Sequence, residues 1–320
     1  QKNAHLEKNF IKKFARIKEK MMPKKILVLS GGFSAEREVS AVSGKGVAQA
    51  LRECGYDVVE HDLTSAYKLL EALQAEKPDA VFNALHGNWG EDGEIQGFLD
   101  MLQIPYTHSG LAASFLGMNK LLTKEICRLN GIKTADYQTL TYGEFKKRGT
   151  FMDFPYVLKP QSDGSSVGVF IVKNKKDESV VCYDDDACEL LAEKYIAGKE
   201  ITVAVIDGKA CGVTELRPQT GFYDYNAKYS NGATMHILPA EIDERAAKTA
   251  MEYAEKIHRL LGCNAVSRSD FRYNDKDGVV FLEINTNPGM TPLSLVPEQA
   301  EYVGISYQEL CKKLVENAAC

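Results

Sequence analysis

The residue pattern most suggestive of chemistry is a pair of oxygen-bearing side chains, Glu283 and Asn285, that follows the apolar run 279–282. Residues two apart on a strand share a face, so these two side chains point the same way while Leu282 and Ile284 face the other. The segment therefore predicts two oxygen ligands mounted on an apolar support.

A second strand is expected upstream, around Arg268 and Asp270, which are also two residues apart. The sequence Asp-Lys-Asp-Gly at 275–278 makes a good hairpin loop, so the two strands are expected to be antiparallel neighbours. With this loop, Asp270 lies opposite Glu283 and Arg268 lies opposite Asn285. All four polar side chains are then expected on one face of the hairpin.

Two facing carboxylates repel each other unless positive charge lies between them, which points to a hard divalent cation. Mg²⁺ prefers oxygen ligands and completes its shell with water and phosphates, so Asp270, Glu283 and Asn285 are enough for one or two ions, with Mn²⁺ as an alternative. Arg268 suits an anion that forms during a reaction. The alternative is a solvated hairpin whose polar face meets water. Arg268 and the Asn-Pro-Gly turn at 287–289 favour the metal site.

Composition limits the class of protein. The 320 residues are 44% hydrophobic and 26% charged, which is typical of a globular chain with two or three domains. A formal net charge of -5 argues against a general nucleic-acid binder, although a local basic pocket for phosphates is compatible with it. The eight cysteines include no C-x-x-C pair and no zinc-like spacing, which favours reduced thiols and a cytoplasmic location. No apolar run approaches the length of a membrane span.

The first 23 residues differ in composition from the rest. Their apolar residues fall on one helical face among many lysines, which indicates a basic amphipathic helix. We expect an extension appended to the folded chain, with a membrane or partner contact as the alternative.

Alternating strand and helix patterns follow from 24 to 110 and predict a parallel sheet wrapped by helices. The loop after the first strand lacks the G-x-G-x-x-G pattern of dinucleotide sites, and its Glu36 suits a substrate ammonium better than a phosphate. A plain loop glutamate beside Arg37 is the alternative. His86 begins a glycine-rich loop that suggests close approach to a ligand, and a packing or capping histidine is its alternative.

Phosphate binding is indicated where a strand delivers Lys159 to a loop of glycines and serines at 160–168. Backbone amides of such a loop can fold around phosphate oxygens while the lysine supplies charge. A plain hairpin turn is the alternative, and the pattern is not a Walker A loop. A helix is expected over 111–129, carrying Lys120 and Lys124. The tyrosine-rich stretch 222–229 predicts either a lid over a site or a surface loop.

Seven stretches, in this order, resemble the D-alanine:D-alanine ligases of the ATP-grasp superfamily over about residues 24–315. They are GGFSAEREVS, LHGNWGEDG, KPQSDGSSVGV, EKYIAGKE, FYDYNAKY, SRSDF and FLEINTNPGMTPLSLVP. The resemblance implies an α/β (α+β) ATP-grasp fold. A parallel α/β domain (24–110) would be followed by two α+β domains (111–196 and 197–320) that sandwich ATP.

The resemblance also implies roles for individual residues. ATP would be held by phosphate-binding, adenine-binding and ribose-binding residues, namely Lys120, Lys159, Ser165, Ser166, Glu193, Lys194, Ile196, Glu200 and Lys228. Two magnesium ions would be carried by Asp270, Glu283 and Asn285. The two substrate molecules would be placed by Glu36, His86, Arg268, Ser294 and Leu295. Tyr229 would join Glu36 and Ser165 in a network that positions the lid.

The implied activity is ATP-dependent joining of two D-alanine molecules through an acyl phosphate, in a cytoplasmic homodimer that supplies peptidoglycan synthesis. Another ATP-grasp ligase that joins a different carboxylate and amine is the nearest alternative, because its nucleotide and metal residues would look alike. Ser294, Leu295 and the Tyr229 stretch favour the dipeptide. A non-catalytic nucleotide-binding protein is a further alternative, and Arg268 beside a full metal set argues against it.

Overall fold

The computed structural model describes residues 24–162, 164, 168–218 and 234–320. Four of the expected site residues, Ser165, Ser166, Lys228 and Tyr229, lie outside the described residues, as does the expected amphipathic extension. All eight cysteines lie within the described part and are free thiols, as expected. Among the described residues, no helix combines the length and apolar character that a membrane span requires.

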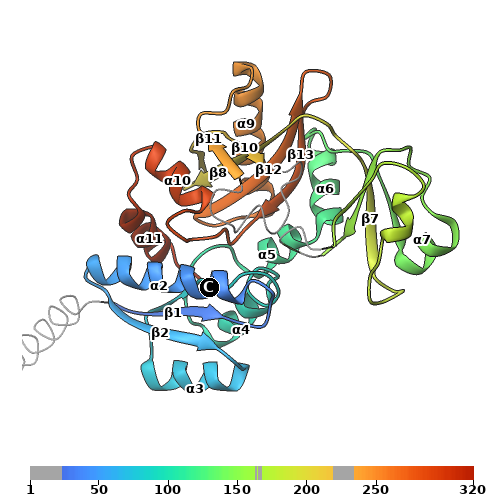
Figure 1. Ribbon diagram of the computed structural model, residues 1–320. Helices are drawn as coiled ribbons and strands as arrows, with labels where there is room; N and C mark the ends of the chain where they lie inside the picture. The colour runs from blue at the N-terminus through green and yellow to red at the C-terminus, as the bar shows by residue number, and fades with distance from the viewer. Residues whose placement is uncertain (1–23, 163, 165–167, 219–233) are drawn as a thin grey trace, which may run out of the picture.

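The N-terminal part forms the expected parallel sheet. Its strands are β1 (Lys25–Gly31), β2 (Asp57–Leu63) and β3 (Ala80–Asn83), in the spatial order β2-β1-β3. Because β1 is covered on both faces, Ile26 and Val28 pack toward α2 (Arg37–Glu53), whereas other β1 residues pack toward α3 (Ala66–Glu76). Figure 1 shows these two helices on opposite sides of the sheet, and α4 (Glu94–Leu102) follows β3.

The single helix expected over 111–129 is two helices, α5 (Leu111–Met118) and α6 (Lys120–Leu129). Asn119 separates them with an extended backbone, and its side chain accepts a hydrogen bond from Leu122 N. Because Asn119 caps the second helix in this way, it ends the first helix. The spacing of apolar residues alone did not reveal this break. Both helices pack against the C-terminal sheet.

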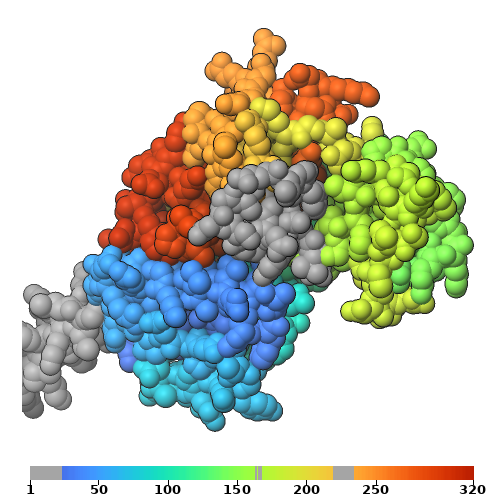
Figure 2. Space-filling model, in the orientation of Figure 1, coloured from blue at the N-terminus to red at the C-terminus, as the bar shows by residue number. Residues whose placement is uncertain are grey.

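A central antiparallel sheet has the order β4 (Tyr137–Thr141), β7 (Glu189–Lys194), β5 (Tyr156–Pro160), β6 (Phe170–Val172). Helix α7 (Tyr142–Arg148) and a short 3₁₀ helix (Asp177–Val180) complete it. The sequence pattern at 193–196 predicts the end of a passage from helix to strand, and this prediction is wrong for Glu193 and Lys194 because both lie within β7. In the space-filling view this part of the chain projects to one side of the rest (Figure 2).

The third sheet is antiparallel, in the order β11 (Thr234–Ile237), β10 (Thr214–Pro218), β8 (Lys199–Ile206), β12 (Val266–Asn274), β13 (Gly278–Asn285). The short β9 (Lys209–Ala210) also pairs with β8. The long helix α9 (Glu244–Leu261) packs on this sheet, and α10 (Leu295–Tyr302) and α11 (Tyr307–Glu316) end the chain.

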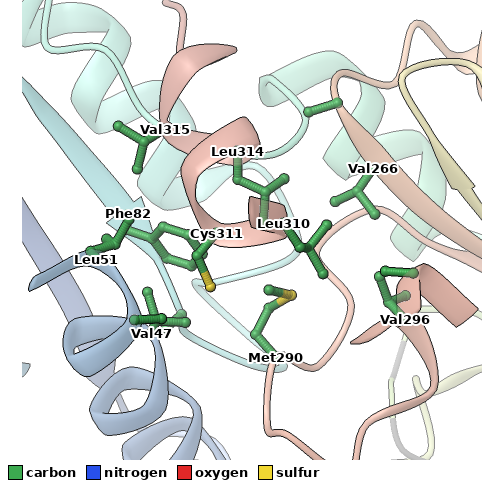
Figure 3. Close-up of a cluster of buried hydrophobic side chains, with 14 of the residues drawn as sticks. Val47, Leu51, Phe82, Val266, Met290, Val296, Leu310, Cys311, Leu314 and Val315 are labelled. Carbon is green, nitrogen blue, oxygen red and sulfur yellow. The ribbon is translucent and has the colours of Figure 1, made fainter. Parts of the chain in front are cut away.

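One hydrophobic core joins the first and third sheets. Val47, Leu51 and Phe82 from the N-terminal part pack with Met290 and Leu310 from the C-terminal part (Figure 3). Burial of this shared apolar surface fixes the loops of the N-terminal sheet relative to the end of β13. The domain limits expected from the sequence stay predictions.

Candidate active site

The hairpin of β12 and β13 has the expected register at its polar end. Asp270 lies opposite Glu283 and Arg268 lies opposite Asn285. The turn and the strand pairing next to it differ from those expected.

At the turn, Asn274 pairs with Gly278, so the loop contains three residues rather than four. An irregularity after Asp270 pairs Phe271 with Phe281 and leaves an extra residue, Leu282, on β13. The shorter loop and the β-bulge each shift the register by one residue in opposite directions, so their effects cancel at the site.

Asp270 is held in place from two sides. Its carboxylate accepts hydrogen bonds from Arg268 Nε (3.0 Å) and Nη2 (2.9 Å), and from Thr202 Oγ1 (2.5 Å) on the neighbouring strand β8. The residue as a whole is 7% exposed. Arg268, expected to meet a developing oxyanion, therefore also orients the carboxylate beside it. Sequence reasoning missed Thr202, although a threonine inside the otherwise apolar run of β8 is a signal that could have been used.

The other acidic ligand candidate lies beside a lysine from a different element. Lys120, at the start of α6, has its Nζ 3.7 Å from Glu283 Oε2, and its backbone N–H donates to Gln161 O (2.9 Å) at the end of β5. Asn285 Oδ1 accepts from Asn287 N (2.9 Å). The structure thus brings Asp270, Glu283 and Lys120 to one end of the hairpin.

Lys159 lies in a second cluster of charges. Its Nζ is 2.8 Å from Glu193 Oε2, and Lys124 Nζ is 2.7 Å from Glu193 Oε1. Burial raises the pKa of the Glu193 carboxyl, but the two lysines outweigh burial and hold that pKa below its ordinary value. Lys159 and Glu193 are thus together, as a common nucleotide site requires. Lys124 had no assigned role in the sequence reasoning.

Two other expected nucleotide residues, Ile196 in the loop between β7 and β8 and Glu200 near the start of β8, are held by Arg272 of β12. Arg272 donates to Ile196 O (3.1 Å), to Gly198 O (2.7 Å) and to Glu200 Oε2 (3.1 Å). Ile196 is buried, whereas the side chain of Lys194 is exposed. Sequence reasoning missed Arg272, which lies on the same face of β12 as Arg268 and Asp270.

The N-terminal loops bring Glu36 and His86 to the same region. Glu36 precedes α2 and is 7% exposed. A Cβ atom at Gly87 would lie 3.0 Å from Glu36 Oε2, and one at Gly164 would lie 3.8 Å from the same atom. Gly164, which follows Lys159 in the chain, therefore lies close to the Glu36 carboxylate.

His86 is buried within a hydrogen-bonded chain. Its Nε2 lies 3.1 Å from Ser43 Oγ, and its Nδ1 lies 3.2 Å from Glu91 Oε1. Burial raises the pKa of the Glu91 carboxyl, and the charge of Glu36 adds to this effect while His86 opposes it. Asn287 donates to Leu85 O (2.8 Å), so the turn after β13 is tied to the loop that carries His86.

Ser294 and Leu295 lie at the start of α10, after the turn that follows β13. Ser294 Oγ accepts from Thr291 N (3.1 Å) and is 2.7 Å from Thr291 Oγ1. Leu295 packs against Leu216 of β10. The start of α10 is therefore attached to the third sheet through Leu295.

The donor set at the hairpin suits a hard cation. Among the described residues, no three His, Cys, Asp or Glu side chains form a metal site by themselves. The expected set instead combines two facing carboxylates, Asp270 and Glu283, with the amide of Asn285, and all offer oxygen. Oxygen donors in a set too small to fill a coordination shell are what Mg²⁺ uses when phosphates and water supply the rest.

Comparison with known families decides the relationship. Residues 126–316 match the family model for the D-ala D-ala ligase C-terminus, and residues 67–109 match the model for the D-ala D-ala ligase N-terminus. The chain belongs to the D-alanine–D-alanine ligase family. D-alanine–D-alanine ligase of Rhizorhabdus wittichii is 48% identical over 307 residues, which is 92% of this chain and 97% of that protein. The ligase of Zymomonas mobilis is 49% identical over 306 residues, covering 92% and 94% of the two chains.

Solved ligase structures share the fold. The crystal structure of D-alanine–D-alanine ligase from Bacillus anthracis complexed with ATP matches with a TM-score of 0.77 and 34% identity, over 92% of this chain and 96% of that one. The VanG D-Ala:D-Ser ligase from Enterococcus faecalis matches with a TM-score of 0.77 and 28% identity, over 92% and 99%. The ATP-grasp architecture expected from the ligase resemblance is therefore confirmed.

Proposed function

We propose that the protein joins two D-alanine molecules at the expense of ATP, releasing D-alanyl-D-alanine, ADP and phosphate, and that the dipeptide enters peptidoglycan precursor synthesis. The observation that carries the proposal is the facing pair Asp270 and Glu283, with Lys120 Nζ 3.7 Å from Glu283, in a member of the ligase family. An enzyme that moves a phosphoryl group needs such a convergence of metal-binding carboxylates and cations.

Magnesium binding belongs to the proposal. Asp270, Glu283 and Asn285 would hold one or two Mg²⁺ ions, and Mn²⁺ would suit the same oxygen atoms. When bound, the metal neutralises charge on the phosphates and on the transferring group. Thr202 and Arg268 keep Asp270 oriented toward this role through their hydrogen bonds.

The reaction proceeds in two displacements. A carboxylate oxygen of the first D-alanine attacks the γ-phosphorus of ATP, ADP leaves, and an acyl phosphate forms. The amine of the second D-alanine then attacks the carbonyl carbon, loses a proton, and phosphate leaves with the former carboxylate oxygen. Lys120 and Lys159 counter the charge of the phosphates, and Arg268 faces the oxyanion of the tetrahedral intermediate.

Substrate placement uses residues from both ends of the chain. Glu36 pairs with the ammonium of the first D-alanine, and His86 beside Glu91 helps to place this substrate. Ser294 and Leu295 receive the carboxylate of the second D-alanine. The nucleotide base and ribose contact Glu193, Lys194, Ile196 and Glu200, and Ser165, Ser166, Lys228 and Tyr229 complete the site. Exclusion of water by the closed site protects the acyl phosphate from hydrolysis.

The proposal extends to cellular context. A cytoplasmic location supplies ATP and suits eight free thiols. We also propose a homodimer as the assembly state.

A ligase with a different second substrate is the competing proposal, favoured by the likeness to the VanG D-Ala:D-Ser ligase. The test is ADP release with magnesium and D-alanine alone, compared with D-alanine plus D-serine, with products identified by mass. Dipeptide from D-alanine alone, abolished in Glu283→Gln, supports the proposal. ADP release only when D-serine is added would favour the competing ligase, and nucleotide binding with no ADP release would indicate a non-catalytic protein.

A further inference from the structure

Lys124 is a buried lysine that the proposed reaction does not use. It lies four residues after Lys120 on α6, and its side chain is 0% exposed. Its Nζ is 2.7 Å from Glu193 Oε1 and 3.4 Å from the backbone oxygen of Phe281 on β13. The ammonium therefore sits where α6, the central sheet and the C-terminal sheet meet.

The Glu193 carboxylate is shared by two lysines. Lys124 approaches Oε1, and Lys159 approaches Oε2 at 2.8 Å. With all three groups ionised, the cluster holds two positive charges and one negative charge, and so keeps a net positive charge. A neutral pair of Glu193 and Lys159 would already satisfy the carboxylate, and a further buried ammonium costs desolvation. Lys124 therefore adds a positive charge beyond the one that neutralises Glu193.

The extra charge changes what Lys159 can bind. If Lys124 were absent, both oxygens of Glu193 would be available to Lys159, and the resulting neutral pair would attract a phosphate weakly. With Lys124 engaged at Oε1, Lys159 is held by Oε2 alone and the cluster attracts an anion. Charge-assisted hydrogen bonds to phosphate depend on this balance.

We propose that Lys124 is a positioning residue for ATP, which acts through Glu193 to set the place and the effective charge of the Lys159 ammonium. The proposal rests on the proposed function, in which Lys159 contacts the nucleotide phosphates. Lys124 itself touches no substrate in this account. We therefore expect Lys124 to affect the affinity for the phosphates of the nucleotide and not the affinity for the nucleoside.

The ionisation of Glu193 is consistent with this account, and that of Lys124 is a balance of opposed influences. Burial is the largest influence on Lys124 and lowers the pKa of its ammonium, whereas the charge of Glu193 opposes that change. The two lysines together hold the pKa of the Glu193 carboxyl below its ordinary value, so the carboxylate that links them is ionised at neutral pH.

The test compares binding of ADP and of adenosine to the full chain by calorimetry, because the ratio of their dissociation constants isolates the contribution of the phosphates. Lys124→Met keeps the length of the side chain and removes the charge. A second variant, Lys124→Met with Glu193→Gln, restores one net positive charge on Lys159. Cys127→Ala is the matched control, because Cys127 is also 0% exposed on α6 and has no ion pair to Glu193.

We expect Lys124→Met to reduce the preference for ADP over adenosine about tenfold, because the Glu193–Lys159 pair that remains is neutral and attracts phosphate less strongly. The double variant should recover most of that preference, and Cys127→Ala should keep it. An unchanged preference in Lys124→Met, a loss that the double variant does not recover, or an equal loss in Cys127→Ala would overturn the proposal. A parent protein that binds ADP no better than adenosine would overturn the proposed function as well.

Discussion

Replacement of Thr202 by valine tests how the hairpin site is held. Thr202 is buried on β8, and its Oγ1 donates to Asp270 Oδ1 at 2.5 Å. Valine has nearly the same shape, so the change removes the hydroxyl without opening a cavity. A hydrogen bond to a charged group contributes about 1.5–3 kcal/mol to stability, and we expect the free energy of unfolding to decrease by an amount in that range.

The functional effect of Thr202→Val should appear in the magnesium requirement. Without the Thr202 hydroxyl, the hydrogen bonds from Arg268 are those that remain to orient Asp270 in the part of the chain that the structure describes. Loss of a partner that orients a metal ligand typically costs about 10–100-fold in metal affinity or activity. We therefore expect the concentration of Mg²⁺ that gives half-maximal ADP release to rise about tenfold or more, with turnover recovering partly at high Mg²⁺.

Thr214→Val is the matched control for this experiment. Thr214 lies directly opposite Thr202 on β10 and is 0% exposed. Its Oγ1 has no hydrogen-bond partner in the described part of the chain. This variant should keep both the stability and the magnesium dependence of the parent. An unchanged magnesium dependence in Thr202→Val, measured by titration at saturating ATP and D-alanine, would refute the idea that Thr202 orients a metal ligand.

Three further changes give distinct outcomes. Glu283→Gln removes a metal-binding charge but keeps the shape, so turnover should collapse while the thermal unfolding midpoint stays close to that of the parent; parent-like turnover at ordinary Mg²⁺ would exclude Glu283 as a ligand. Tyr229→Phe should still form dipeptide but accept D-lactate better relative to D-alanine, by about tenfold at most for one hydrogen bond, and an unchanged product ratio by mass would remove Tyr229 from acceptor selection. Burial lowers the pKa of His108 from 6.5 to about 3, so the unfolded state binds more protons between these values and stability falls as the pH drops below 6.5. By pH 5 this loss of stability is about 2 kcal/mol. Urea unfolding should show that the free energy of unfolding decreases between pH 7 and pH 5 in the parent, and that the decrease is about 2 kcal/mol smaller in His108→Gln. An equal decrease in the two proteins would contradict this prediction.

Local patterns in the sequence predicted the hairpin correctly. Alternation and turn residues place Asp270 opposite Glu283, and that pairing is present. The agreement depends partly on compensation, because a shorter turn and a bulge at Leu282 cancel. Neither feature has a strong signal in one sequence. The break at Asn119 shows the same limit, because the apolar period continues across a residue whose side chain caps a new helix.

Residues that support the site could not be predicted because their partners are distant in sequence. Thr202 reaches Asp270 across 68 residues, and Arg272 reaches Glu200 across 72. Both contacts require β8 and β12 to be neighbours in the antiparallel sheet, and strand order in a sheet depends on the whole fold. Lys124 lies on the same helical face as Lys120, but its use of Glu193 depends on how α6 meets the central sheet.

The central claim, ligation through an acyl phosphate, is tested most directly by isotope transfer. The parent protein is mixed with ATP, Mg²⁺ and D-alanine labelled with ¹⁸O in its carboxylate, and the dipeptide and phosphate are analysed by mass. The account predicts D-alanyl-D-alanine together with one ¹⁸O atom in each phosphate released, because the carboxylate oxygen that attacks phosphorus leaves with the phosphate. Dipeptide accompanied by unlabelled phosphate, or ADP formed without dipeptide, would contradict it.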